Sequence, residues 1–161
     1  PDGPVDFGLD RTSLTSGMPA REVVVLHATA RPEKEWPIAS WIELGQSLHS
    51  RGFSIVLPWG NEAERQRSLK IATALPNAVV PALQPLDQVA RMLARAAFVV
   101  GVDTGLLHVA AALGVPLAAI FVGTEPGQHG PLGAGTIEIV GTIGAMPSVA
   151  RVRAAVERIA P

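Results

Sequence analysis

The chain has 161 residues, of which 48% are hydrophobic, which predicts a single folded domain with a substantial core and excludes an intrinsically disordered chain. Its 13 basic and 14 acidic residues leave a net charge of −1, so the broad basic surface of a nucleic-acid-binding protein is excluded. The absence of cysteine excludes disulfides, thiolate metal sites and a cysteine nucleophile, and the absence of any apolar run of about 20 residues predicts neither a transmembrane helix nor a signal peptide.

Residues 1–22 are interrupted by Pro, Gly, Ser and Thr, which predicts a linker or edge segment, with a candidate short strand at Val5–Leu9. The folded domain is expected to occupy residues 23–161. Its first interior strand is predicted at Glu22–His27, because this run is rich in β-branched residues. Further strands are expected at 53–57, 78–80, 98–100, 117–121 and 136–140, and helices at 36–51, 62–75, 85–95, 105–113 and after Ser148.

This alternation of strands and helices predicts an α/β fold, a doubly wound Rossmann-like parallel sheet of about six strands with helices on both faces. Right-handed crossovers favour the strand order 3-2-1-4-5-6. In that order the first and fourth strands are neighbours where the winding reverses, and ligands bind at the carboxyl ends of the strands there.

The segment Phe98–Leu113 is the strongest candidate site. A buried apolar strand ends at Gly101-Val-Asp103-Thr104-Gly105, and an alanine-rich helix follows. The amides of Thr104 and Gly105 at the helix N-terminus favour an anion such as phosphate. The alternative is an ordinary capped helix, in which Asp103 or Thr104 binds these amides without a ligand.

Opposite this corner, the predicted order places the polar loop that follows the first strand. This loop contains Thr29, Arg31 and Lys34, and a compact ammonium group is a good partner for a phosphate. Taken alone, Lys34 is better explained as a solvated loop lysine, because charged residues are mostly exposed. Facing the helix start at Asp103, it is predicted to form the second half of an anion site.

The loop after the second strand is the third candidate. Glu62 or Glu64 would follow that strand as the carboxylate that commonly binds ribose hydroxyls, although the charged run also fits a solvated helix face. Trp59 is predicted either to shield a nucleobase or to pack under the sheet edge. His108 lies four residues after Thr104, on the same side of the helix, where it is either a site residue or a packed histidine.

Several classes of site are absent from the sequence. It contains no G-x-x-x-x-G-K-[ST], G-x-G-x-x-G, H-E-x-x-H or G-x-S-x-G motif. Its four histidines lack ligand spacing, so we predict no metal site built by the protein and no cofactor. A loop rich in Gly and Pro runs from 123 to 135, and its segment Gly127–Pro131, which includes His129, is interpreted as a lid or as an ordinary loop.

Three segments together resemble a known family. They are Leu26-His-Ala-Thr-Ala-Arg-Pro-Glu-Lys-Glu-Trp-Pro37, Leu57-Pro-Trp-Gly60 and Val102-Asp-Thr-Gly-Leu-Leu-His108. This combination is similar to the C-terminal half of the lipopolysaccharide heptosyltransferase I family, ADP-heptose glycosyltransferases of GT-B architecture, over nearly the whole chain from Val23 onward. The resemblance implies an inverting transfer of heptose from ADP-heptose to the Kdo residue of the lipopolysaccharide inner core.

Matched position by position, the resemblance implies that Lys34 contacts the diphosphate and stabilises the departing ADP, as the catalytic residue of this chain. Thr29 is implied as a phosphate contact, with Ala30 where some relatives carry a second threonine. Glu64 stands at the position of the ribose-binding carboxylate. The other implied donor contacts are Asp103 for heptose hydroxyls, Thr104 and Gly105 for the diphosphate, and Leu106 and His108 along the pocket.

The resemblance also implies a separate N-terminal domain that holds the acceptor site and the general base. This chain alone is therefore expected to bind the donor without turnover. The implied partners are ADP-heptose and, in the full enzyme, the Kdo–lipid A precursor, at the cytoplasmic face of the inner membrane and without nucleic acid. Two alternatives remain open: a GT-B donor domain for a UDP- or dTDP-sugar, and a non-catalytic Rossmann-like nucleotide-binding module.

Overall fold

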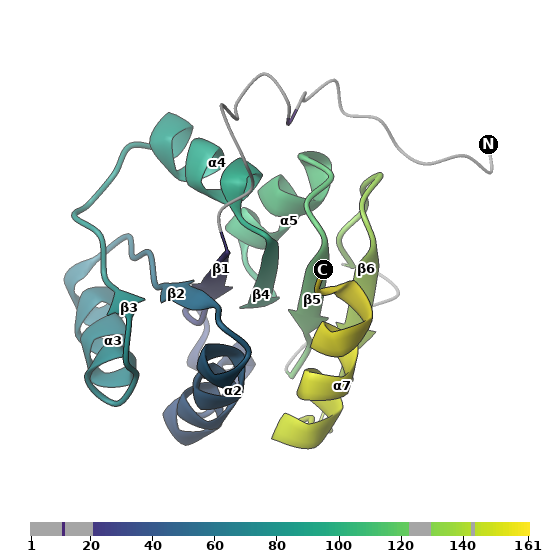
Figure 1. Cartoon of the computed structure of the whole chain (residues 1–161), viewed down its shortest axis with the longest axis horizontal. Helices are drawn as coiled ribbons and strands as arrows, with labels where there is room; N and C mark the ends of the chain where they lie inside the picture. Colours follow the sequence, from purple (N-terminus) through teal and green to yellow (C-terminus); the bar gives the residue numbers. More distant parts are fainter. Residues whose placement is uncertain (1–10, 12–20, 123–129, 143) are drawn as a thin grey trace.

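The computed structural model describes residue 11 and residues 21–122, 130–142 and 144–161 (Figure 1). The strands are β1 (Glu22–Leu26), β2 (Ser54–Val56), β3 (Ala78–Val79), β4 (Phe98–Val102), β5 (Leu117–Ile120) and β6 (Ile137–Val140). The helices are the 3-10 helix η1 (Pro32–Lys34) and the α-helices α2 (Ile38–Ser50), α3 (Glu62–Thr73), α4 (Leu86–Arg95), α5 (Gly105–Ala112) and α7 (Val149–Ile159). The candidate strand at Val5–Leu9 lies outside the described residues.

The strands form one sheet in the order β3-β2-β1-β4-β5-β6, and every neighbouring pair is parallel. The predicted α/β fold and its winding order are therefore confirmed. The reversal falls between β1 and β4, where Leu26 is in register with Gly101. The carboxyl ends of these two strands thus lie side by side, and the loops that follow them begin at the same edge of the sheet.

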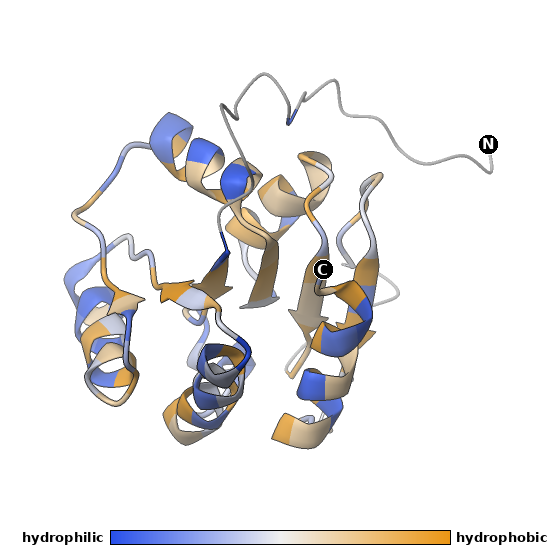
Figure 2. Ribbon diagram, viewed as in Figure 1, coloured by the Kyte–Doolittle hydropathy of each residue, from blue (hydrophilic) through white to orange (hydrophobic). Residues whose placement is uncertain are grey.

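Helices cover both faces of the sheet, with α2, α3 and α7 on one side and α4 and α5 on the other (Figure 1). The alternation along β1 explains this arrangement, because Val23 and Val25 belong to the first core cluster and Val24 and Leu26 to the second. Figure 2 shows the apolar strands enclosed by helices whose polar residues face outward. A continuous apolar strand buried on both faces is typical of a parallel sheet.

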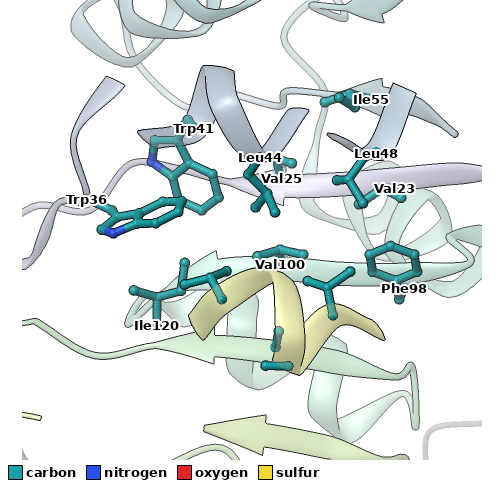
Figure 3. Packing of buried hydrophobic residues seen from close by; sticks show 14 of the residues in the cluster. Val23, Val25, Trp36, Trp41, Leu44, Leu48, Ile55, Phe98, Val100 and Ile120 are labelled. Carbon is teal, nitrogen blue, oxygen red and sulfur yellow. The ribbon is translucent and has the colours of Figure 1, made fainter. Parts of the chain in front are cut away.

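Trp36 lies outside the helix to which the sequence assigned it. Helix α2 begins at Ile38 with Pro37 as its N-cap residue, so the predicted start at Trp36 was wrong by two positions. Instead Trp36 is fully buried, packs edge-on against Trp41 at 4.9 Å between ring centroids (Figure 3), and donates a hydrogen bond from Nε1 to the Pro147 carbonyl at 3.0 Å. This packing holds the end of the loop that carries Lys34.

Gly101 allows β4 and β1 to approach α5 closely. A Cβ atom at this position would lie 2.8 Å from Leu26 Cβ and 3.2 Å from Leu107 Cδ1, closer than packed carbon atoms allow. The first turn of α5 therefore sits directly against the carboxyl end of β1. Within the described ranges, no helix combines the length and the apolar character needed to cross a membrane.

Candidate functional site

The loops after β1 and β4 meet in an ion pair. Lys34 Nζ lies 2.9 Å from Asp103 Oδ2, and the two side chains are 15% and 10% exposed. Lys34 ends η1, whose turn is closed by a hydrogen bond from the Lys34 amide to the Arg31 carbonyl at 2.9 Å. The prediction that these loops face each other across the winding reversal is confirmed, because residues 69 positions apart are in direct contact.

Asp103 also faces His108. The His108 Nε2 atom lies 3.7 Å from Asp103 Oδ1, and the His108 side chain is 45% exposed. One carboxylate therefore has the ammonium of Lys34 at one oxygen and the imidazole of His108 near the other. The structure brings these three predicted site residues together at the open end of the β1–β4 junction.

The N-terminus of α5 is open beside this group. Thr104 is the N-cap residue in an extended conformation, and its side chain makes no capping hydrogen bond. A Cβ atom placed on Gly105 would meet no heavy atom within 4 Å. The space beside Gly105 in the first turn is therefore open, at the end of the helix where the dipole favours an anion.

The structure separates the two carboxylates that the sequence left as alternatives. Asn61 is the N-cap of α3 and accepts from the Glu64 amide at 2.9 Å, while Glu64 Oε2 accepts from the Gly60 amide at 2.7 Å. This reciprocal bonding turns Glu64 back toward the end of β2. Glu62 instead bonds Gln66 and Arg65 on the outer surface of its own helix, and the Gln66 bond lowers the pKa of its carboxyl.

A pocket of about 320 Å³ lies at the carboxyl ends of β1, β2 and β4. Three predicted site residues line it, namely Glu64, Thr104 and Leu106. Its outer wall contains Leu83 and Leu86, which are 60% and 66% exposed. The pocket thus combines polar groups with exposed leucines, a lining that suits a ligand with both polar and apolar parts.

Trp59 and Gln84 complete this pocket. Trp59 donates from Nε1 to the Pro81 carbonyl at 2.7 Å, which attaches the β2 loop to the loop before α4. Trp59 therefore packs at the sheet edge and lines the pocket, and its role in shielding a nucleobase stays a prediction. The side-chain oxygen of Gln84, which the sequence did not single out, is buried there without a hydrogen-bond partner.

Thr29 lines a different pocket from Thr104 and Leu106. This second cavity, of about 450 Å³, lies between the β1 loop and α3 and includes Arg67 and Lys70. Ala28 and Glu64 line both cavities and therefore form the boundary between them. The role predicted for Thr29 as a phosphate contact stays a prediction.

His27 is the main polar residue whose role the sequence did not reveal. It is fully buried directly after β1, lines the first pocket, and lies with Nε2 2.6 Å from Ser68 Oγ on α3. Burial, aided by the positive charge of Arg67, lowers the pKa of His27 from 6.5 to about 4, so the ring is neutral at physiological pH. The one feature of the sequence that could have pointed to His27 is its position at the end of the first strand, next to the polar loop.

Two predictions, the lid that includes His129 and the absence of a metal site, are not tested by these contacts. His129 and most of the candidate lid lie outside the described residues. Among the residues that the structure describes, no group of three or more His, Cys, Asp or Glu side chains is placed to hold a metal ion. The candidate site consists of Lys34, Asp103 and His108, the N-terminal end of α5 and the adjoining pocket.

The chain matches a known protein family and curated relatives. Residues 7–157 match the family model of glycosyltransferase family 9 (heptosyltransferase). The chain is 43% identical over 140 residues to lipopolysaccharide heptosyltransferase 1 of Pseudomonas aeruginosa, an alignment that covers 86% of this chain and 39% of that protein.

Solved structures of heptosyltransferases are also similar to this chain. The Escherichia coli heptosyltransferase WaaC with ADP is similar with a TM-score of 0.88 and 32% identity, over 99% of this chain and 51% of that one. The same enzyme with ADP-2-deoxy-2-fluoro heptose gives a TM-score of 0.77 over 98% of this chain and 49% of that one. The present chain thus spans about half the length of these relatives or less, and it belongs to glycosyltransferase family 9, the heptosyltransferase family.

Proposed function

We propose that this chain is the donor-binding half of a heptosyltransferase that uses ADP-heptose. The observation that carries the proposal is the Lys34–Asp103 pair beside the open N-terminus of α5. A cation and the open N-terminal end of a helix at one edge of a parallel sheet would form a site for a diphosphate. The similarity to an enzyme solved with ADP and with an ADP-heptose analogue supports this assignment.

The donor would lie along the carboxyl ends of the strands. Its adenosine would occupy the pocket of about 320 Å³, with the base against Leu83 and Leu86 and the ribose hydroxyls at Glu64. The diphosphate would then cross the amides of Thr104 and Gly105 toward Lys34. The sugar would reach Asp103, whose carboxylate accepts hydrogen bonds from hydroxyl groups.

The catalytic contribution of these residues is electrostatic. When the bond between the sugar and the diphosphate breaks, negative charge grows on the departing phosphate oxygen. Lys34 and the α5 amides would stabilise that charge, because they are oriented before the reaction and need no rearrangement at the transition state. His108, near the opposite oxygen of Asp103, would line the same part of the site.

The whole enzyme is proposed to transfer the heptose to Kdo of the lipopolysaccharide inner core with inversion, at the cytoplasmic face of the inner membrane. The general base and the acceptor site would lie in the half of the enzyme that corresponds to the unmatched part of its relatives. This chain alone would bind the donor and leave it intact. Transfer by the isolated chain would refute that division of labour.

Titration calorimetry with ADP, UDP and dTDP tests the donor assignment. We expect saturable binding of ADP at one site and much weaker binding of UDP and dTDP. The three nucleotides share a diphosphate but carry different bases, so a pocket specific for adenine should bind ADP preferentially. Absence of heat with ADP, together with an unchanged melting temperature, would refute the proposal. Preference for UDP or dTDP would instead indicate a transferase for another nucleotide-sugar.

Replacing Gly105 by alanine is expected to weaken ADP binding by about tenfold without destabilising the protein. The new methyl group meets no protein atom within 4 Å, but it would occupy the space proposed for the diphosphate. Because alanine also restricts the unfolded chain, the free energy of unfolding should stay equal or rise by about 0.5 kcal/mol. Urea unfolding and calorimetry measure the two effects, and unchanged ADP affinity would contradict the phosphate position.

A further inference from the structure

Glu64, the candidate ribose ligand, lies in the first half of helix α3, which does not pack against the core through buried apolar side chains. No residue of its first half, 62–67, is buried. In the whole helix only Ser68 and Ile71 are buried, whereas α2 buries Trp41, Leu44, Gly45 and Leu48. Apolar packing therefore does not determine how the first turns of α3 lie against the sheet.

Polar contacts hold this part of α3 instead. The first joins Ser68 Oγ to His27 Nε2 at 2.6 Å, with both side chains fully buried. His27 directly follows β1, which pairs on both sides with β2 and β4, so it is attached to the centre of the sheet. A hydrogen bond is directional, and a buried one is not loosened by competing water.

The second contact comes from Arg67. Its Nη2 donates to the Trp36 carbonyl, and its Nη1 lies 3.4 Å from Glu35 Oε2. Glu35 and Trp36 directly follow Lys34 in the chain. The same turn of α3 is therefore connected to the sheet through Ser68 and to the Lys34 loop through Arg67.

Ser68 lies four residues after Glu64, so the two side chains are on the same face of α3, one turn apart. His27 and Glu64 both line the pocket of about 320 Å³. A rotation or a shift of α3 at Ser68 would therefore move the Glu64 carboxylate along that pocket. Glu64 itself is bonded to Gly60 and Asn61, both in the loop that leads into its helix.

We propose that His27 and Ser68 are positioning residues for donor binding. Their buried hydrogen bond fixes the helix that carries Glu64 and so places its carboxylate on the ribose hydroxyls. This inference rests on the proposed function and assigns to the pair a role in recognising the ribose. Neither residue is among those proposed to contact the diphosphate.

The test compares ADP with 2′,3′-dideoxy-ADP, which lacks the ribose hydroxyls. Ser68→Ala is expected to weaken ADP binding by about five- to tenfold, the effect of one misplaced hydrogen bond, and to leave the affinity for 2′,3′-dideoxy-ADP unchanged. Glu64→Gln should weaken ADP selectively in the same way. In the Ser68→Ala/Glu64→Gln double variant the two losses should not add, because both act on one contact.

Two further variants separate positioning from general stability. Thr73→Ala removes a hydroxyl that donates to the Leu69 carbonyl at 2.8 Å near the exposed end of the same helix, and should leave ADP binding unchanged. His27→Gln keeps an amide near the position of the imidazole Nε2 and should retain more ADP affinity than His27→Leu.

The outcomes distinguish this inference from the proposed function. If the unaltered chain does not bind ADP, the proposed function fails. If Glu64→Gln weakens ADP but Ser68→Ala does not, the function stands and the positioning role is refuted. Equal weakening of ADP and 2′,3′-dideoxy-ADP by Ser68→Ala would also refute it, because a general distortion would not select for the ribose hydroxyls.

Discussion

Replacing Lys34 by methionine is expected to weaken ADP binding by about ten- to a hundredfold. Hydrogen bonds to charged groups contribute about 1.5–3 kcal/mol, which corresponds to that change in affinity. Methionine keeps much of the length of the lysine stem but removes the ammonium that lies 2.9 Å from Asp103. Calorimetry with ADP measures the effect, and adenosine, which lacks phosphate, should bind the variant as well as it binds the unaltered chain.

The same change should also lower the free energy of unfolding, by about 2 kcal/mol, because Asp103 is only 10% exposed and loses its lysine partner. The double variant Lys34→Met/Asp103→Asn removes the charge and should recover most of that stability. It should not recover ADP binding. If the double variant restored both, the contribution of Lys34 would be structural and the diphosphate contact would be refuted.

In the full-length enzyme, Lys34→Met is expected to lower the rate of transfer more than the loss of donor affinity explains. The reason is that charge on the leaving phosphate is larger in the transition state than in the bound donor. The transfer rate at saturating donor concentration measures this additional loss directly, because donor affinity no longer limits the rate. An unchanged rate at saturation would restrict Lys34 to donor binding.

Acid is expected to destabilise the protein through His27. The pKa of this residue is lowered to about 4 by burial and by Arg67, against 6.5 for an ordinary histidine. Between these values the unfolded chain binds a proton that the folded chain does not, so stability falls as the pH decreases. The contribution is complete above pH 6.5, and about 3 kcal/mol of it is lost as the pH falls to about 4.

Urea unfolding between pH 7 and pH 4 measures this loss. His27→Gln provides the matched control, because it cannot be protonated and still offers an amide to Ser68. Carboxylates and other histidines titrate in both proteins, so the difference between the two curves isolates His27. Arg67, the charged side chain on α3 that acts on the imidazole, is present in both. Parallel curves would contradict the prediction.

The elements of the fold could be predicted because their signals are local. Buried strands such as Phe98–Val102 appear as short apolar runs, and Asn61 and Ser148 cap their helices as residues of that type commonly do. Parallel order and crossover handedness then placed the Lys34 loop opposite Asp103. The structure confirms both steps with one ion pair.

Local sequence patterns did not predict the structure where the same residues fit two different local roles. Trp36-Pro37 resembles a helix start, but the tryptophan packs into the core against Trp41 and bonds Pro147, which is 111 residues away. Glu62 and Glu64 are both acidic residues in the first turn of α3. Only the bonds of Glu64 to Gly60 and Asn61 turn it toward the pocket.

The sequence by itself determined the order of the strands, the helix that begins after Asp103 and the loop that brings Lys34 to it, because these follow from periodicity, capping and chain handedness. Only the tertiary structure decided that His27 would bond Ser68, 41 residues away, that Arg67 would hold the Lys34 loop, and that Thr29 would line a separate cavity. These contacts depend on how α3 lies on the sheet. No periodic pattern encodes that placement, because the first half of the helix is held by polar side chains rather than by a buried apolar face.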